Sequence, residues 1–299
     1  MQLSVLGAAA APMAAAAETP ADDALGLARG ADALNRYVQA GGKASGGPGE
    51  LAVGAWMADH LKALGFETRT QPFTAPYFNT SEATLAAGAA SAMVLPQAIV
   101  VTTSSDGVAG PLAVRTIWTA GADVAGSIVI LQLPHGRWST AAGPAVGAPV
   151  RAAFQGGALA VLLVTNGPTG RALALNADGR KPMFAGPVAI LAPDTATPFF
   201  QLPPGTPARL KIVGTAGQRE THNLVGRLDR GHPQWLVVST PRSGWFVCAG
   251  ERGGGVAVWM MLATWASRAK LPVNLAFVST SGHEYENLGA VSGANSREG

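Results

Sequence analysis

With 299 residues, the chain is long enough for one large domain or two ordinary ones. Hydrophobic residues make up 48% of it and charged residues 13%, so a sizeable core is expected and extensive disorder is excluded. The net charge of +3 is spread along the chain without a basic cluster, which argues against nucleic-acid binding, and a single cysteine, Cys248, excludes an intramolecular disulfide framework.

The first residues have the pattern of an export signal. Val5 to Ala17 are almost all small or apolar, and polar Glu18-Thr19-Pro20 follow. An apolar stretch ending in small residues is typical of a signal peptide, although the usual basic start is missing. Residues 1–19 are therefore predicted to be a signal peptide-like segment of an exported protein, periplasmic or extracellular; an Ala-rich tail is the alternative. No later apolar run has the length of a membrane span, so no stable span is expected.

Residues 20–75 are predicted to form helices followed by a strand. Ala21 to Gln39 has helical character. Glu50 to Leu64 is predicted to be an amphipathic helix that ends at Gly65. Its expected apolar side consists of Leu51, Ala55, Met57, Ala58, Leu61 and Leu64. A strand is predicted at Phe66 to Phe73.

Residues 76–216 have a different texture, rich in Gly, Pro, Thr and Ala. A short helix is predicted at Ala148 to Gln155, with Pro149 in its first turn. Short β-type runs predict strands at Ala98 to Thr103, Ser127 to Leu131, Leu159 to Thr165, Val188 to Leu191 and Ala208 to Val213.

Residues 217–299 contain a predicted parallel crossover unit. Trp235 to Ser239 and Val273 to Ser279 have the composition and length of buried strands. A Gly-rich turn, Gly250 to Gly255, lies between them. A helix follows the turn, with one apolar face made by Val256, Trp259, Leu262, Ala263 and Ala266. In such units the chemistry lies beyond the carboxyl ends of the strands, which predicts the site there.

Polar residues cluster after both strands, as this prediction requires. The first cluster contains Ser239, Thr240, Arg242, Ser243, Cys248, Glu251 and Arg252. The second contains Ser279, Thr280, Ser281, His283, Glu284 and Glu286.

These segments also resemble a known family. The Gly-Glu-Arg-Gly-Gly-Gly-Val run at 250–256, the Phe-Val-Ser-Thr-Ser-Gly-His-Glu run at 277–284 and Leu-Gly-Ala at 288–290 are similar to the core of the secreted two-zinc exopeptidases, which include aminopeptidases. Ser45 to Phe73 resembles the opening helix and strand of that family. Within 76–216, Val124 to Leu131 and the segments that follow it resemble a protease-associated domain.

The resemblance implies an α/β fold. We expect a three-layer sandwich with a mixed, largely parallel sheet, interrupted at 76–216 by a small β-rich protease-associated domain. Residues 20–75 and 217–299 would form the two parts of the peptidase-like domain, the second part incomplete. The implied substrate is a peptide or a small amide or ester, and the implied cofactor is zinc. The oligomeric state is not predicted.

The resemblance also assigns roles to individual residues. Glu251 stands where the family has a metal-bridging Asp, Glu284 where it has a zinc-ligating Glu, and His283 where it has the general base. The family's His-x-Asp motif is replaced by Ser-Thr-Pro-Arg at 239–242. Because zinc normally takes three or four ligands, Glu251 and Glu284 alone are too few for a tight site.

Three hypotheses therefore stay open. The protein is a zinc aminopeptidase with Glu251 and Glu284 as ligands, or it is a metal-free hydrolase. The metal-free hydrolase would use Ser243 or Cys248 as nucleophile and His283 as base. In the third hypothesis Arg252 pairs with Glu251 or Glu284 in place of a metal, and the protein binds without cleaving.

Overall fold

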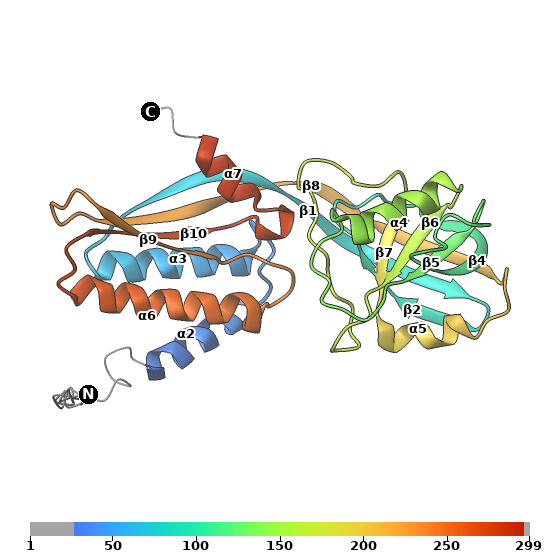
Figure 1. The fold of residues 1–299 in the computed structure, drawn as a ribbon, viewed down its shortest axis with the longest axis horizontal. Coiled ribbons are helices and arrows are strands. Elements are labelled where there is room, and N and C mark those ends of the chain that lie inside the picture. The colour runs from blue at the N-terminus through green and yellow to red at the C-terminus, as the bar shows by residue number, and fades with distance from the viewer. Residues whose placement is uncertain (1–26, 296–299) are drawn as a thin grey trace, which may run out of the picture.

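The computed structural model describes residues 27–295, which form two lobes joined by two long strands (Figure 1). Strand β1 (Glu67–Ala87) pairs antiparallel with β8 (Pro207–Leu228) from Glu67 opposite Arg227 to Ala87 opposite Ala208. The pair passes from one lobe into the other, so a single sheet connects them. The predicted signal segment, residues 1–19, lies outside the described residues.

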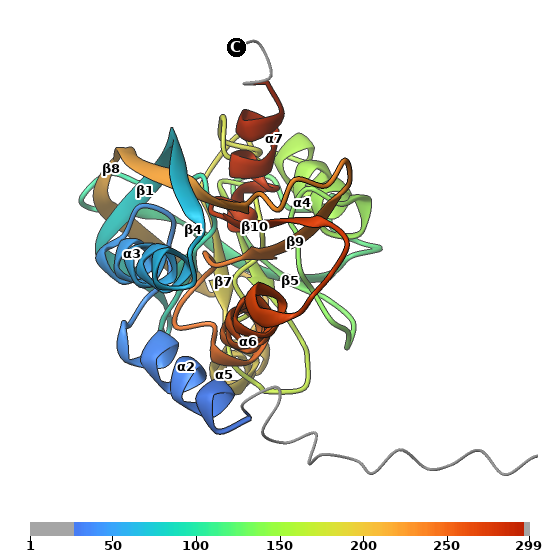
Figure 2. The ribbon, with the colours of Figure 1, turned by 90° about the vertical axis from the view of Figure 1, so that its left-hand side faces the viewer.

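The first lobe has three layers. Its sheet consists of β1, β8, β10 (Asn274–Thr280) and β9 (Trp235–Pro241), with β10 antiparallel to β8 and parallel to β9. Helices α3 (Pro48–Ala63) and α6 (Gly254–Arg268) cover one face, and α7 (Leu288–Asn295) lies on the other (Figures 1 and 2). Helix α2 (Leu27–Gln39) packs against α6. The predicted crossover unit of strand, helix and strand is confirmed.

The core of this lobe lies between the helices and the sheet. Val256, Trp259, Ala263 and Ala266 of α6 are buried there, while Leu262 is only half-buried. The rings of Trp259 and Phe277 meet edge to face at 5.3 Å, a favourable aromatic geometry. Packing of this kind fixes the carboxyl ends of β9 and β10, where the loops of the candidate site begin.

Helix α3 buries only part of the apolar side that was predicted, Met57 and Leu61. Glu50, Val53, Met57 and Leu61 are buried, whereas Ala55 is exposed. Their spacing of three and four residues is that of one helix face. Glu50 was not predicted on the buried face; it is buried there because it pairs with a buried arginine.

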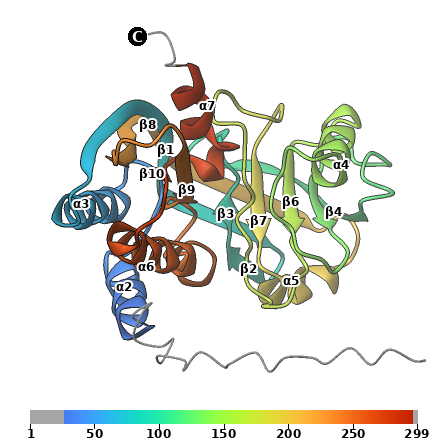
Figure 3. The same cartoon turned by 60° about the vertical axis from the view of Figure 1, so that its left-hand side comes forward.

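The second lobe extends the sheet beyond β8. Strands β4 (Val108–Thr116), β5 (Ile128–Gln132), β6 (Ala160–Val164) and β7 (Val188–Leu191) pair in parallel, and β4 pairs antiparallel with β8. Short β2 (Ala90–Met93) and β3 (Leu95–Pro96) pair with β1 and β7. Helices α4 (Pro144–Gln155) and α5 (Pro193–Phe200) cover opposite faces (Figure 3), so consecutive residues of β5 enter different cores.

Most predicted elements of this lobe are present, but the strand predicted at Ala98 to Thr103 is wrong. That segment has no strand. At the two ends of this segment, isolated backbone hydrogen bonds replace a strand ladder: Gln97 N donates to Val188 O at 2.9 Å, and Thr103 N donates to Ile212 O at 2.9 Å. The predicted α/β class with a mixed sheet is confirmed, whereas the identity of 76–216 as a protease-associated domain stays a prediction. Among residues 27–295, no helix is both long and apolar enough to cross a membrane.

Candidate functional site

The candidate site lies beyond the carboxyl ends of β9 and β10, where the sequence predicts it. Three loops meet there: residues 41–47 before α3, residues 242–253 after β9, and residues 281–287 after β10. Backbone bonds hold the first two together, from Lys43 N to Phe246 O at 2.7 Å and from Gly244 N to Lys43 O at 2.9 Å. The first loop was not predicted to take part.

Glu284 is the centre of a buried hydrogen-bond network. Its side chain is fully buried, and its Oε1 accepts from Ser45 N and Ser45 Oγ, each at 2.7 Å. Its Oε2 accepts from Ser243 Oγ at 2.7 Å. Both hydroxyls are oriented by backbone amides, because Gly282 N donates to Ser45 Oγ at 2.8 Å and His283 N donates to Ser243 Oγ at 3.2 Å. The hydroxyl protons are therefore available for Glu284.

A second buried carboxylate, Glu50, lies next to this network. Arg242 Nε is 2.7 Å from Glu50 Oε1, and both side chains are fully buried. Glu50 Oε2 accepts from Gly46 N and Thr221 Oγ1, each at 3.0 Å. Burial lowers the pKa of Arg242 and the Glu50 charge opposes that effect. An ion pair removed from water needs such additional hydrogen bonds to be tolerated.

Ser281 connects the two carboxylates. Its Oγ lies 3.0 Å from Thr221 Oγ1 and 3.1 Å from Ser45 Oγ. Glu50 and Glu284 thus belong to one polar core, built from the start of α3, from β8 and from the loop after β10. Because these groups are buried, the network positions the loops and is sealed from solvent.

Glu251, Arg252 and Cys248 form a separate, more exposed cluster. The Glu251 side chain is 66% exposed, and its Oε1 lies 2.7 Å from Arg252 Nη2. The Cys248 thiol donates to Glu251 Oε2 at 3.9 Å. Burial, and then the Glu251 charge, raise the pKa of the Cys248 thiol. The cysteine is therefore held as a thiol and not as the thiolate that acts as a nucleophile.

Among the described residues, the His283 ring is hydrogen-bonded to Asn287 and to neither proposed nucleophile. Its Nδ1 contacts Asn287 Oδ1 at 2.7 Å, on the exposed side of the loop. Only its backbone amide contacts Ser243. Ser243 is instead joined to Glu284, so the described geometry contains a hydroxyl–carboxylate pair and not a hydroxyl–imidazole pair.

Several solved bacterial peptidases have a similar structure. The peptidase M28 precursor from Shewanella amazonensis SB2B aligns with 93% of this chain over 69% of its own, with 15% identity and a TM-score of 0.76. A zinc aminopeptidase from Bacillus subtilis aligns with 90% over 64%, with 18% identity and a TM-score of 0.71. The aminopeptidase from Aneurinibacillus sp. strain AM-1 aligns with 92% over 66%, with 21% identity and a TM-score of 0.64. The chain has the fold of these peptidases.

The likeness to these aminopeptidases concerns the fold. The chain spans about two thirds of their length. No protein-family model and no curated protein matches the sequence. Activity, metal and substrate must therefore be argued from the residues of this chain.

Those residues do not fit the zinc site that the aminopeptidase fold implies. Within residues 27–295, no three His, Cys, Asp or Glu side chains are grouped so that they could hold a metal ion. Both oxygens of Glu284 already accept hydrogen bonds from serines, and Glu251 is paired with Arg252. A zinc site needs three or four converging ligands.

Part of this site is predictable from the sequence and part is not. Ser243, His283 and Glu284 were predicted and lie together at the strand ends. The sequence does not indicate that Ser45, Glu50 and Thr221 belong to the site, or that Arg242 is buried in it. Glu50 looks like an ordinary first-turn acid, and Ser45 is one residue of a Gly-rich loop; no pattern distinguishes either from a solvent-exposed residue.

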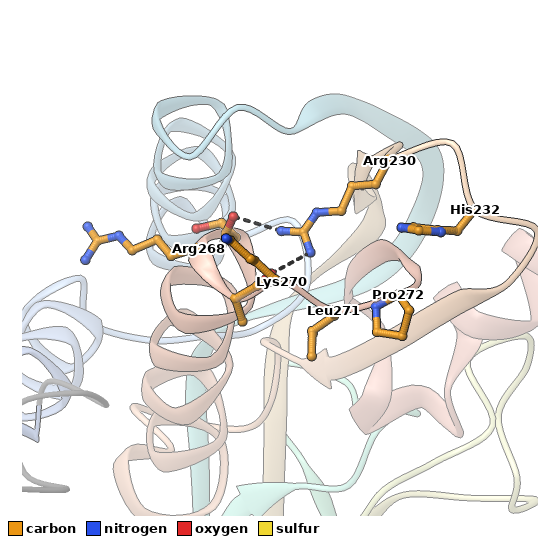
Figure 4. A pocket seen from close by; sticks show the side chains of 8 residues that line it. Arg230, His232, Arg268, Lys270, Leu271 and Pro272 are labelled. Carbon is orange, nitrogen blue, oxygen red and sulfur yellow. Dashed lines mark hydrogen bonds between the residues drawn. The ribbon is translucent and has the colours of Figure 1, made fainter. Parts of the chain in front are cut away.

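A pocket of about 510 Å³ lies at the opposite ends of β9 and β10 (Figure 4). It is lined by Arg230, His232 and residues 267–272. Arg230 donates to the carbonyls of Ala266, Ser267 and Ala269, so its charge caps the carboxyl end of α6. The Arg230 guanidinium is thus engaged by the helix end.

Proposed function

We propose that this chain is a homologue of bacterial aminopeptidases that binds peptides without zinc-dependent cleavage. The observation that carries the proposal is the state of Glu284. A zinc-ligating carboxylate has to direct a free oxygen lone pair at the metal, but here three donors from Ser45 and Ser243 occupy the side chain inside a buried core.

The proposed ligand class comes from the fold and from the exposed loop. The similar structures are aminopeptidases, which act on the amino ends of peptides. In this chain the Glu251 carboxylate is 66% exposed, so it can reach a ligand cation beside its partner Arg252, and Phe246 and Val247 of the same loop are exposed apolar residues. A carboxylate next to apolar surface suits a peptide amino terminus that carries an apolar side chain.

The metal-free hydrolase has less support from the geometry, whichever of its two nucleophiles is considered. Ser243 is fully buried, donates to Glu284 and is not hydrogen-bonded to the His283 ring, so it lacks both substrate access and a base of the usual kind. Cys248 is more accessible, but its raised pKa keeps it protonated.

An assay of aminoacyl-nitroanilide hydrolysis, with added zinc and with a chelator, tests the absence of cleavage. We expect no release of nitroaniline under either condition. Release that the chelator abolishes would contradict the proposal in favour of a zinc enzyme. Release that resists the chelator and disappears in Ser243→Ala or Cys248→Ala would contradict it in favour of a metal-free hydrolase.

Peptide binding is tested separately by calorimetry with short peptides that begin with leucine. We expect binding that weakens when the peptide amino group is acetylated and when Glu251 is changed to Gln. Met93→Lys, a change of an exposed residue in the second lobe, serves as the control and should bind normally. Binding that is indifferent to both changes would overturn the proposed role of Glu251.

A further inference from the structure

The second lobe carries an excess of positive charge between β5 and β7. Residues 133–187 contain a single acidic residue, Asp178. The arginines and the lysine of this segment are all exposed: Arg137, Arg151, Arg171, Arg180 and Lys181. Most of them lie in the loops at the carboxyl ends of β5 and β6, the edge at which parallel sheets commonly bind ligands.

The loop after β5 and the loop after β6 are joined by backbone hydrogen bonds. Gly136 N donates to Asn166 O at 3.0 Å, and Asn176 N donates to Ser139 O at 2.8 Å. Basic residues from distant parts of the sequence therefore lie along one pair of loops. This pair carries Arg137, Arg180 and Lys181, which together are called the basic rim.

The loop after β6 packs on the loop that carries Glu284. Figure 1 shows it, in yellow-green, reaching the first lobe, and Ala177 N donates to Glu284 O at 3.0 Å. A Cβ at Gly179 would lie 2.8 Å from the Cβ of Tyr285. The turn that continues into Arg180 is therefore in direct contact with the site loop.

The loop after β5 reaches the same place. Thr140 Oγ1 donates to the exposed carboxylate of Glu286, and Arg137 lies three residues before Thr140. The loop that carries Glu251 also touches the second lobe, since its Trp245 Nε1 donates to Asn176 Oδ1 at 3.1 Å. The exposed acids of the first lobe and the basic rim thus border one contact between the lobes.

The charges of the basic rim are largely unneutralised. Within the described part of the chain, Arg137 and Lys181 form no ion pair. Arg180 Nη1 lies 3.8 Å from Asp178 Oδ1, but the arginine side chain is 65% exposed, and an exposed pair of this kind is weak. The rim therefore keeps a net positive charge for a ligand.

We propose that the basic rim binds acidic residues of a peptide whose amino end lies at Glu251. The preferred ligand then has an apolar first residue followed by Asp or Glu. The inference rests on the proposed function, because it assigns the remainder of the same ligand. A peptide with a cationic amino end and anionic residues behind it matches both signs of charge, whereas basic residues behind the amino end would meet like charge.

Calorimetry of the full chain with three peptides tests the preference. The peptides are Leu-Ala-Asp-Asp-Ala, Leu-Ala-Ala-Ala-Ala and Leu-Ala-Lys-Lys-Ala. We expect the aspartate peptide to bind about fivefold more tightly than the alanine peptide, as two exposed charge pairs allow, and the lysine peptide to bind most weakly. The preference should shrink in about 0.5 M salt, which screens exposed charges.

Variants locate the preference on the basic rim. Arg137→Ala combined with Lys181→Ala should remove the preference for the aspartate peptide and leave the affinity for the alanine peptide unchanged. Arg209→Ala removes an exposed arginine opposite Ala86, at the end of the β1–β8 pair away from the first lobe, and should keep the preference. Circular dichroism checks that each variant is folded.

The outcomes separate this inference from the proposed function. Equal affinity for the three peptides would overturn the role of the basic rim while peptide binding itself stands. A preference that persists in the folded double variant would also overturn it, because the charge would act from elsewhere. If none of the three peptides bound, the proposed function and this inference would both be wrong.

Discussion

At the residue scale, the protein is characterised by a carboxylate that serves as a structural acceptor. Glu284 accepts from one backbone amide and two serine hydroxyls, and each hydroxyl is itself fixed by an amide. Such a fully satisfied buried network orders its surroundings, and it is costly to disturb because no water can replace a lost partner.

Changing Glu284 to Gln is expected to destabilise the protein although the two side chains have nearly the same shape. The amide nitrogen would face a hydroxyl or an N–H donor, and an unsatisfied buried group costs about 1–3 kcal/mol. Denaturant unfolding measures the loss. Glu251→Gln, at an exposed position, is the control and should change stability by less than about 0.5 kcal/mol. Equal effects of the two changes would contradict the assigned role of Glu284.

Cys248 is expected to react with thiol reagents more slowly than an exposed cysteine near neutral pH. Its pKa is raised, first by burial and then by Glu251, so the thiolate forms only at higher pH than in a free cysteine. Removal of the Glu251 charge in Glu251→Gln should lower the pKa and shift the alkylation profile to lower pH. A profile that does not move would show that Glu251 does not act on the thiol.

At the scale of elements, the loop before α3 couples the helix to the site. Gly46 N donates to Glu50, and the neighbouring Ser45 donates to Glu284. Gly46 has a φ of +69°, and a Cβ at this position would lie 2.6 Å from the carbonyl oxygen of Glu220. A glycine is therefore required here both by conformation and by space.

Gly46→Ala is expected to destabilise the protein more than Gly41→Ala. Both glycines have positive φ, which costs an alanine about 1–2 kcal/mol, but a Cβ at Gly41 meets nothing within 4 Å. The difference between the two unfolding free energies thus isolates the close contact with Glu220. If the two variants were equally stable, the loop would not be held against β8 as described.

The sequence predicts elements well where local pattern and tertiary environment agree. The strands β9 and β10 and the helix between them are apolar runs of the right period, and they form as predicted. The lengths of β1 and β8 were missed because both contain many polar residues and two of the β1 positions are prolines, Pro72 and Pro76. Their pairing is a long-range contact, which no local pattern reveals.

The same limit applies to the candidate site: its place is visible in the local sequence pattern, but its long-range partners are not. Polar residues after two parallel strands indicate the place and include both Ser243 and Glu284, which are hydrogen-bonded to each other. The partners that determine the chemistry, Ser45 and Glu50, come from a distant loop and helix. Only the fold brings them within 3 Å of their acceptors or donors.

At the scale of the whole molecule, the second lobe contacts the loops of the site. Trp245 Nε1 donates to Asn176 Oδ1 at 3.1 Å, and Ala177 N donates to Glu284 O at 3.0 Å. The rings of Trp245 and Tyr285 meet edge to face at 5.6 Å. The loop that carries Glu284 is therefore held by both lobes.

Asn176→Ala is expected to loosen that loop without unfolding the sheet. Loss of the bond to Trp245 removes one of the contacts between the lobes, so the amides of residues 282–288 should exchange faster with solvent. Hydrogen exchange measures this, with exposed Thr169→Ala in the same lobe as the control. Unchanged protection of residues 282–288 would mean that the second lobe does not support the site.

Glu284 is thus interpreted as an acceptor for serine hydroxyls and not as a zinc ligand. Titration of the purified full chain with zinc, followed by calorimetry, tests this interpretation most directly. We expect no stoichiometric zinc binding, either by the wild type or by Glu284→Gln. Stoichiometric zinc binding that is lost in Glu284→Gln or Glu251→Gln would contradict it.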